Sequence, residues 1–356
     1  MTIVQLPEIA AALDLNDRAC FDRIYEYSVS EARLRAPAAM VPWVERTFGN
    51  LDAIETQRIV RVSNKVTGEG TLFNDLRARR PVRAALETDS NFESYLENDP
   101  WEDPMASTPE DMFGRLSNNA GVTAANVAKY DAVHSILVFA EPNPLAFTRE
   151  SIVAQTRLAR QWFAAANHHD AEAVYPYLMW NCLWRAGGSI VHGHTQISLA
   201  RGRHYSKIER LRQDGARYQA DEHRSYFDDL RQIHTALGLG KESNGIFTGA
   251  HLTPIKEKEC LLIGDELNDD LASAMYSVLA TFRDSLGVQS FNVGVLMPPI
   301  VSYDESWNGF PVIVRIVDRG NLGTRTSDIG GMEMFAESVV AADPFSLSKT
   351  LAKAGA

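Results

Sequence analysis

The stretch spanning residues 181–196 constrains this chain most, because a glycine-rich turn in it leads into histidines at alternate positions. Side chains of an extended strand alternate between its two faces, so His192, His194 and Gln196 are expected to point the same way. The two intervening residues are expected to point the opposite way. The pattern therefore predicts three polar side chains along one edge of a cleft.

The turn before these histidines contains Gly187, Gly188 and Ser189. Such a sequence can turn sharply, expose backbone N–H groups and offer a hydroxyl, which suits an anion such as phosphate. A histidine held in one tautomer can present its other ring nitrogen as a nucleophile. Attack on the α-phosphorus of an activated nucleotide would form a nucleotidyl-histidine, which a second substrate carrying a phosphate could then discharge.

Gln196 bears on the fate of such an intermediate. Its amide can donate a hydrogen bond to a non-bridging phosphate oxygen, but it cannot act as an acid or base near neutral pH. This favours transfer to a phosphate acceptor, which is a good nucleophile, over hydrolysis by water. Two other interpretations of the histidine pair stay open, namely ordinary strand histidines and zinc ligands. The glutamine and the Gly-Gly-Ser turn favour phosphate chemistry.

The composition limits the class of protein. With 356 residues the chain is long enough for two domains or one large duplicated domain. A net charge of −11 argues against a general binder of nucleic acid or membrane surfaces. Three scattered cysteines without a CxxC pair indicate neither a disulfide framework nor a cysteine zinc site. No signal peptide or long apolar run is visible, so we expect a reducing, cytoplasmic compartment.

Apolar residues at helical spacing predict that residues 1–57 are mostly helical, including Phe21–Tyr27 and Val41–Arg46. From residue 58 strands and turns are expected, and residues 90–115 are predicted to be a polar loop. The second half repeats the order of the first, strands then helix then strands. An α+β fold with large antiparallel sheets flanked by helices, duplicated along the chain, is the predicted fold class. Further elements are predicted as helices at 149–168, 207–237, 265–286 and 343–352, and as strands at 134–139, 259–264, 291–297 and 312–317.

A compact basic cluster follows the first strands, with Arg77, Arg79 and Arg80 in an otherwise acidic protein. By itself such a run is typical of a solvated surface. Arginine is also suited to bidentate contact with phosphate, so the cluster could neutralise a nucleotide. His134, at the start of a predicted strand, is expected to be a packed or hydrogen-bonded histidine rather than a ligand.

Several separated stretches together resemble the galactose-1-phosphate uridylyltransferase family of the histidine-triad-like nucleotidyltransferases, over residues 58–352. The active strand of that family carries Asn, a turn with Gly and Ser, and then His-Pro-His-x-Gln. This chain keeps that spacing at Asn181, Gly187, Ser189, His192, His194 and Gln196. The resemblance implies that His194 is the nucleophile, and the carbonyl of His192 is expected to fix its tautomer. Gln196 and Ser189 match phosphate-binding positions, and Asn181 matches a position on the hexose-phosphate side.

Other segments extend the resemblance. The segment around Arg77 and Arg80 looks like the R-A-K-R-P segment of the family, which implies that both arginines contact the nucleotide. Asn126 is a weaker match to a nucleotide-binding asparagine. Glu333 resembles the glutamate of the V-G-Y-E-M segment, which contacts sugar hydroxyls.

The departures from the family concern metals. Its typical zinc site uses a CxxC pair, a histidine after the strand at 134–139 and the first histidine of the triplet. The CxxC pair is absent here and the later position is Asn143, so no metal is expected at His192. The histidines that some members use for iron also lack counterparts near Val295–Pro298, and Gly193 replaces a proline. We expect neither a metal nor another cofactor.

The resemblance implies three parts in this chain: a helical N-terminal extension at 1–57, a histidine-triad-like half with the catalytic strand at 58–205, and a second such half at 206–356. The predicted function is a nucleotidyltransferase, uridylyltransferase-like or adenylyltransferase-like. It would transfer a nucleoside monophosphate from a nucleotide sugar to a sugar 1-phosphate through a covalent intermediate on His194.

Two alternatives remain. The first is a phosphorylase that cleaves a nucleotide sugar or a dinucleoside polyphosphate with inorganic phosphate. The second is a nucleotide-binding or assembly protein without activity, which predicts tight nucleotide binding and no covalent adduct. The expected partners are a nucleotide sugar and a phosphorylated small-molecule acceptor, with no nucleic acid and no membrane. The resemblance also implies a homodimer, because an open antiparallel sheet leaves edges to cover.

Overall fold

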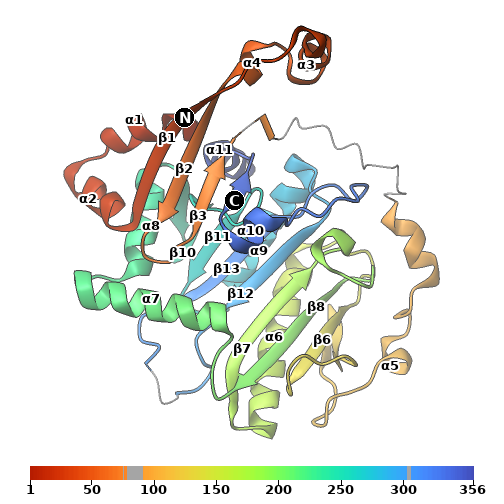
Figure 1. Cartoon of the computed structure of the whole chain (residues 1–356). Helices are drawn as coiled ribbons and strands as arrows, with labels where there is room; N and C mark the ends of the chain where they lie inside the picture. The colour runs from red at the N-terminus through yellow and green to blue at the C-terminus, as the bar shows by residue number, and fades with distance from the viewer. Residues whose placement is uncertain (75, 78–90, 303–305) are drawn as a thin grey trace.

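The computed structural model describes residues 1–74, 76–77, 91–302 and 306–356, and the strands among them form two sheets (Figure 1). The larger sheet has ten strands, and every neighbouring pair in it is antiparallel. Its strands are, in spatial order, β4 (Ser117–Asn118), β5 (Gly121–Ala125), β6 (His134–Phe139), β8 (His194–Arg201), β7 (Ala173–Asn181), β12 (Phe291–Leu296), β13 (Val312–Asp318), β11 (Cys260–Gly264), β10 (Ile246–Ala250) and β9 (Gly240–Ser243). The predicted α+β class with large antiparallel sheets is confirmed.

The two halves of the larger sheet join at β7 and β12. Strands β4 to β8 come from the earlier part of the chain and β9 to β13 from the later part. At the junction, the pairing runs from Tyr177 opposite Leu296 to Asn181 opposite Asn292. The sheet is therefore continuous across the predicted boundary at 205/206, which lies between β8 and the next helix. The division into two histidine-triad-like halves stays a prediction.

Two long helices, α6 (Arg149–His169) and α9 (Asp269–Ala280), cover one face of the larger sheet (Figure 1). Each helix begins at a side-chain cap, because Thr148 accepts from the amide of Ser151 and Asn268 accepts from the amide of Leu271. The face of α6 that meets the sheet is apolar at helical spacing. Its buried residues include Ile152, Leu158, Ala159, Trp162, Phe163 and Ala166.

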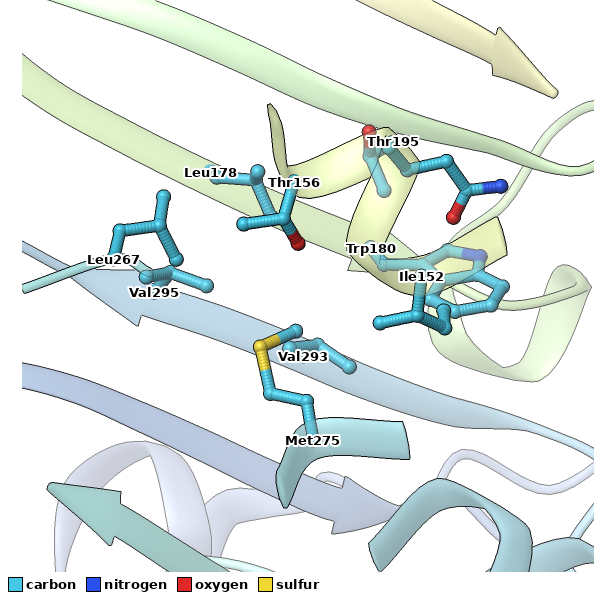
Figure 2. A pocket seen from close by; sticks show the side chains of 10 residues that line it. Ile152, Thr156, Leu178, Trp180, Thr195, Leu267, Met275, Val293 and Val295 are labelled. Carbon is cyan, nitrogen blue, oxygen red and sulfur yellow. The ribbon is translucent and has the colours of Figure 1, made fainter. Parts of the chain in front are cut away.

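Figure 2 shows the layer between these helices and the sheet. A cavity of about 20 Å³ lies there, and Thr195 of β8 points into it beside Leu178 and Trp180 of β7. Thr195 therefore faces the helices. Because neighbours in a strand alternate, His194 and Gln196 lie on the opposite face of the sheet, as the sequence pattern predicts.

The smaller sheet consists of β1 (Tyr25–Arg33), β2 (Thr56–Asn64), β3 (Gly70–Phe73) and β14 (Ser338–Val340). It joins strands from both ends of the chain, since β14 pairs in parallel with β3. It contacts the later half of the structure through Thr71, whose hydroxyl donates to the Pro254 carbonyl at 2.8 Å. Asn64 donates to the Tyr226 hydroxyl, also at 2.8 Å.

The remaining helices are short or lie outside the two sheets. The predicted helical region 207–237 is two helices, because His223 adopts a left-handed conformation between them. The α-helices are α1 (Leu6–Ala11), α2 (Leu15–Ile24), α3 (Val41–Phe48), α4 (Asp52–Glu55), α5 (Pro104–Ser107), α7 (Ser206–Glu222), α8 (Tyr226–Ala236), α10 (Gly331–Phe335) and α11 (Pro344–Ala354). Short 3₁₀ turns occur at Ile3–Gln5, Ala38–Met40, Phe92–Asn98 and Trp184–Ala186, and a π-helical turn at Thr281–Ser285 follows α9.

One prediction for the N-terminal 57 residues is wrong. Phe21–Tyr27 is not a continuous helix, because α2 ends at Ile24 and β1 begins at Tyr25. Tyr25, Tyr27 and Val29 alternate with polar residues, and this period of two is typical of a strand. All nine residues of β1 pair with β2.

The N-terminal segment is anchored to the rest of the protein by a buried carboxylate. Asp229 of α8 is 1% exposed and accepts hydrogen bonds from Arg23 (2.7 Å) and from the Tyr218 hydroxyl (2.6 Å). Arg224 donates to it as well. Burial by itself raises the pKa of Asp229, but the hydrogen bonds from Arg224, Tyr218 and Arg23 outweigh it and lower the pKa.

Replacing Asp229 by alanine should lower the free energy of unfolding by roughly 3–5 kcal/mol, because it leaves the partly buried Arg23 without its partner. Urea unfolding followed by circular dichroism measures this. Asp22→Ala, which removes an exposed ion pair of the same helix α2, is the control and should change stability little. Since the folded-state pKa of Asp229 is depressed, its contribution should be lost as the pH falls through that pKa. Equal stability of the two variants would contradict the anchoring role.

Candidate active site

The turn between β7 and β8 owes its shape to its glycines. Gly187 has a left-handed conformation with φ of 91°. At Gly188 a Cβ would lie 2.7 Å from the Asn181 carbonyl oxygen, so only glycine fits there. The amides of Gly187 and Gly188 donate to the carbonyls of Trp184 and Leu183. This corrects one expectation, because these two N–H groups close the turn and do not face an anion.

His194 is the first residue of β8 and lies opposite Val138 of β6. Its Nδ1 is 2.8 Å from the carbonyl oxygen of His192. A carbonyl only accepts, so Nδ1 carries the hydrogen and Nε2 keeps its lone pair. The expected fixing of the tautomer by His192 is thus present in the geometry. His194 is 7% exposed, and burial away from water lowers its pKa, with the charge of His192 acting in the same direction.

His192 lies just before β8 and cannot supply a free ring nitrogen. Its Nε2 is 2.8 Å from the Phe139 carbonyl oxygen and its Nδ1 is 2.5 Å from Oδ2 of Asp99. Both partners accept hydrogen bonds, so the ring is satisfied only when both nitrogens carry hydrogen. Both ring nitrogens of His192 are thus engaged, and of the two histidines only His194 has a nitrogen available for chemistry.

The side chain of Gln196 is oriented by His134. The backbone amide of Tyr130 donates to Nδ1 of His134 at 3.3 Å, so the hydrogen of this ring is on Nε2. That nitrogen is 3.0 Å from Oε1 of Gln196 and donates to it. The amide nitrogen of Gln196 is then turned away from His134 and can donate elsewhere. Burial lowers the pKa of His134, which keeps the ring neutral.

Asn126 approaches the same histidine. Its Nδ2 is 3.3 Å from Nε2 of His134, while its Oδ1 accepts from the amide of Ala128. Two donor nitrogens cannot bond to each other, so the hydrogen of His134 is directed to Gln196. The structure thus places Asn126 beside the His134–Gln196 pair, although its match to the family pattern is weak.

Asn181 belongs to a second network of side-chain hydrogen bonds. Its Oδ1 accepts from Asn292 at 2.7 Å, and Oδ1 of Asn292 accepts from Arg319 at 2.5 Å. Arg319 in turn binds Asp328 with two hydrogen bonds of 2.7 and 2.9 Å. These contacts connect the end of β7 to the loop that precedes Glu333.

Three other predicted site residues are not joined to this group. Glu333 accepts from the amide of Gly330 at the start of its own helix α10, at 2.8 Å. Ser189 and Arg77 are exposed. Within the described part of the chain, no hydrogen bond links any of the three to His194 or Gln196. Arg80 lies outside the described residues.

The sequence patterns missed the segment Phe92–Ser107, which we call the strap. It contains a 3₁₀ turn and α5 where a loop was expected, and it runs along the right side of Figure 1. The Trp101 ring lies edge-on to the His194 ring with centroids 4.9 Å apart. Trp101 also packs against an apolar patch of β5 and β6, formed by Val122, Ala124, Ile136 and Val138. A tryptophan within a polar segment was the one sequence signal for this contact.

The close contact between residue 193 and Phe139 of β6 explains why this residue is a glycine. A Cβ at this position would lie 2.5 Å from the Phe139 ring. The amide of Phe139 also donates to the Gly193 carbonyl at 2.9 Å. The absence of a side chain therefore lets the segment before β8 pack closely on β6, which positions His192 and His194.

No group of three or more His, Cys, Asp or Glu side chains in the described ranges of the chain is arranged to hold a metal ion. None of the helices in the same ranges is long and apolar enough to cross a membrane.

No protein-family profile matches this sequence, and no curated protein matches it either. Solved structures do match. An ADP-glucose phosphorylase from Arabidopsis thaliana with bound ADP-glucose has a TM-score of 0.62 at 14% identity, covering 80% of this chain and 95% of its own. A structure described as uridylyltransferase has a TM-score of 0.56 at 13% identity, with 83% and 98% covered. A GalT-like protein from Arabidopsis thaliana has a TM-score of 0.53 at 14% identity, with 70% and 89% covered. The chain therefore has the fold that these three structures share.

Proposed function

We propose that this protein is a nucleotidyltransferase that moves a nucleoside monophosphate from a nucleotide sugar to a sugar 1-phosphate through a covalent intermediate on His194. The observation that carries the proposal is the hydrogen bond from Nδ1 of His194 to the His192 carbonyl, which leaves Nε2 as a nucleophile. Gln196 lies two residues further along the same face of β8, and its Oε1 is engaged by His134, which leaves its amide nitrogen able to donate.

The reaction would take two displacements at one phosphorus atom. In the first, Nε2 of His194 attacks the α-phosphorus, the bond to the bridging oxygen breaks, and a sugar 1-phosphate leaves. In the second, a phosphate oxygen of the acceptor attacks the same phosphorus, the phosphorus–nitrogen bond breaks, and the neutral imidazole is restored. Because the acceptor is already an anionic nucleophile, the second step needs no general base.

The roles of the other residues are assigned by the family resemblance. Gln196 would donate to a non-bridging oxygen as negative charge develops, with Ser189 as a second donor. Asn126, Arg77 and Arg80 would contact the nucleotide, with the backbone of Gly187 and Gly188 shaping the phosphate side. Asn181 and Glu333 would face the sugar or the acceptor, and the chain of contacts from Asn181 to Asp328 favours this grouping.

A phosphorylase is the second candidate. The likeness to an ADP-glucose phosphorylase favours it. The first displacement would be the same, and inorganic phosphate would then discharge the intermediate to give a nucleoside diphosphate. The two candidates therefore differ in the acceptor and not in the nucleophile.

We also propose a cytoplasmic role in carbohydrate metabolism and a homodimer. Cys20, Cys182 and Cys260 are all buried and unpaired, which fits a reducing compartment. The edge strand β9 carries the exposed residues Lys241, Glu242 and Ser243, so a partner at that edge would have to meet a polar surface.

Incubation with a panel of UDP-, ADP-, GDP- and CDP-sugars and dinucleoside polyphosphates, without acceptor, should add the mass of one nucleoside monophosphate to the protein. Intact-protein mass spectrometry measures this gain and identifies the base. His194→Ala should form no adduct, whereas His168→Ala, which removes an exposed histidine of α6, should behave as wild type. Adding sugar 1-phosphates or inorganic phosphate to the isolated adduct then separates transferase from phosphorylase. Near-normal turnover by His194→Ala would refute the proposed nucleophile.

Gln196→Ala should slow adduct formation by a factor of about 10²–10³, because it removes a donor to the developing charge. His134→Leu should slow it in the same way by releasing Gln196, and His134→Gln, whose amide can still donate to Oε1, should restore most of the rate. Single-turnover kinetics measure these effects. In the Gln196→Ala background, His134→Leu should have no further effect on the rate. An additional loss there would show that His134 does not act through Gln196.

The rate of adduct formation should change little as the pH is lowered to 6.5. The reactive form of His194 is the neutral imidazole, and its pKa is below the ordinary value of 6.5 because the ring is buried. Lowering the pH to 6.5 should therefore leave most of the ring neutral, and the rate should fall only at more acid pH. A single-turnover pH profile measures the midpoint. A midpoint at or above 6.5 would contradict the neutral, buried nucleophile.

A further inference from the structure

The strap touches the candidate active site at three points. Tyr95 packs against Trp184 in the glycine-rich turn, with ring centroids 5.7 Å apart. Asp99 binds the ring of His192. Trp101 meets the rings of both His192 and His194, at 5.9 and 4.9 Å.

Both carboxylate oxygens of Asp99 are engaged. Oδ1 accepts from the backbone amide of Trp101 at 2.9 Å, and Oδ2 is 2.5 Å from Nδ1 of His192. The side chains of Asp99 and His192 are only 8% and 5% exposed, so water does not screen the pair effectively. One carboxylate therefore fixes the turn that carries Trp101 and also the ring of His192.

The orientation of His192 determines that of His194. The ring of His192 is held between Asp99 and the Phe139 carbonyl, and the backbone carbonyl of the same residue accepts from Nδ1 of His194. If Asp99 is removed, Nδ1 of His192 loses the hydrogen-bond partner that the described residues give it, and the Phe139 carbonyl and the Trp101 ring remain as contacts of the ring. The peptide that carries the carbonyl then keeps the hydrogen bond from the Gly193 amide to the Pro142 carbonyl (2.9 Å) and loses the constraint from the His192 side chain.

We propose that Asp99 is a positioning residue for the nucleophile. It fixes His192 by a buried hydrogen bond, and through the His192 carbonyl it fixes the tautomer and direction of His194. Its catalytic consequence rests on the proposed function, whereas its effect on the tautomer of His194 does not.

Three variants test this role. Asp99→Ala removes both contacts. Asp99→Asn can keep both, because its oxygen can accept from the Trp101 amide while its amide donates to a neutral His192. Glu97→Ala, which removes an exposed carboxylate from the same strap, is the control for loss of one negative charge.

The first readout is ¹⁵N NMR of protein labelled at histidine, which reports the protonation of each ring nitrogen without any substrate. In the wild type, His192 should show two protonated nitrogens and His194 a proton on Nδ1. In Asp99→Ala, His194 should show a mixture of tautomers, and Glu97→Ala should match the wild type. In Asp99→Asn, His192 should become neutral while His194 keeps its Nδ1 proton. Signals are assigned from His192→Gln and His194→Ala.

The second readout is the single-turnover rate of adduct formation. Asp99→Ala should be slower than wild type by roughly tenfold or more, as for other carboxylates that orient a functional histidine. Asp99→Asn should recover most of that loss. Thermal melts show whether each variant is folded. If Asp99→Ala does not fold, the protonation of His192 in Asp99→Asn provides the test.

The outcomes separate the two proposals. An unchanged His194 tautomer in Asp99→Ala, or a doubly protonated His192 in folded Asp99→Asn, would overturn the role of Asp99 whatever the activity. The expected tautomer changes together with no adduct from any donor in the wild type would support the positioning role and refute the nucleotidyltransferase function.

Discussion

The hydrogen bond between Nδ1 of His194 and the backbone carbonyl of His192 is the contact on which the chemistry of this site depends. The acceptor is a peptide carbonyl two residues earlier, so this contact needs no second side chain. Its strength as a constraint comes from the fixed position of the peptide. That position is secured by the close packing of Gly193 against Phe139, by the hydrogen bond from the Gly193 amide to the Pro142 carbonyl, and by the contact of His192 with Asp99. Local backbone geometry thus decides which nitrogen of His194 is reactive.

The side chains of this site are supported partly by the central sheet and partly by the less regular strap. His194 and Gln196 belong to a central strand of a continuous sheet, with β6 and β7 on either side. Their orienting partners, His134 and Asp99, come from the first residue of β6 and from the strap. Each partner is nearly fully buried and makes one hydrogen bond toward the site and at least one back to the surrounding backbone or ring. This arrangement holds the two polar side chains in place.

The sequence predicted much of this architecture and part of the site. Alternation along residues 192–196 identified which side chains share a face, because a strand has a period of two whatever surrounds it. The antiparallel sheets and the long helices followed from apolar periodicity in the same way. Asp99 and Trp101 could not be found, since their roles depend on a polar segment that folds back over β8 from far away in sequence. The N–H groups of Gly187 and Gly188 were misjudged, because a turn motif does not reveal whether its donors face inward or outward. The strand at Tyr25 was missed where a helix ends and a strand begins without a break.

The junction of β7 and β12 has a mechanical consequence. Five residues of β7 pair with β12, so the two halves share one uninterrupted ladder of backbone hydrogen bonds. Relative rotation of the halves would break that ladder, and hinge closure around a ligand is therefore not available to this architecture. Separating the halves at 205/206 would leave one unpaired strand edge on each piece, that of β7 and that of β12. The two halves thus form one cooperative unit, and any adjustment to a ligand of varying size must come from the segments that lie over the sheet.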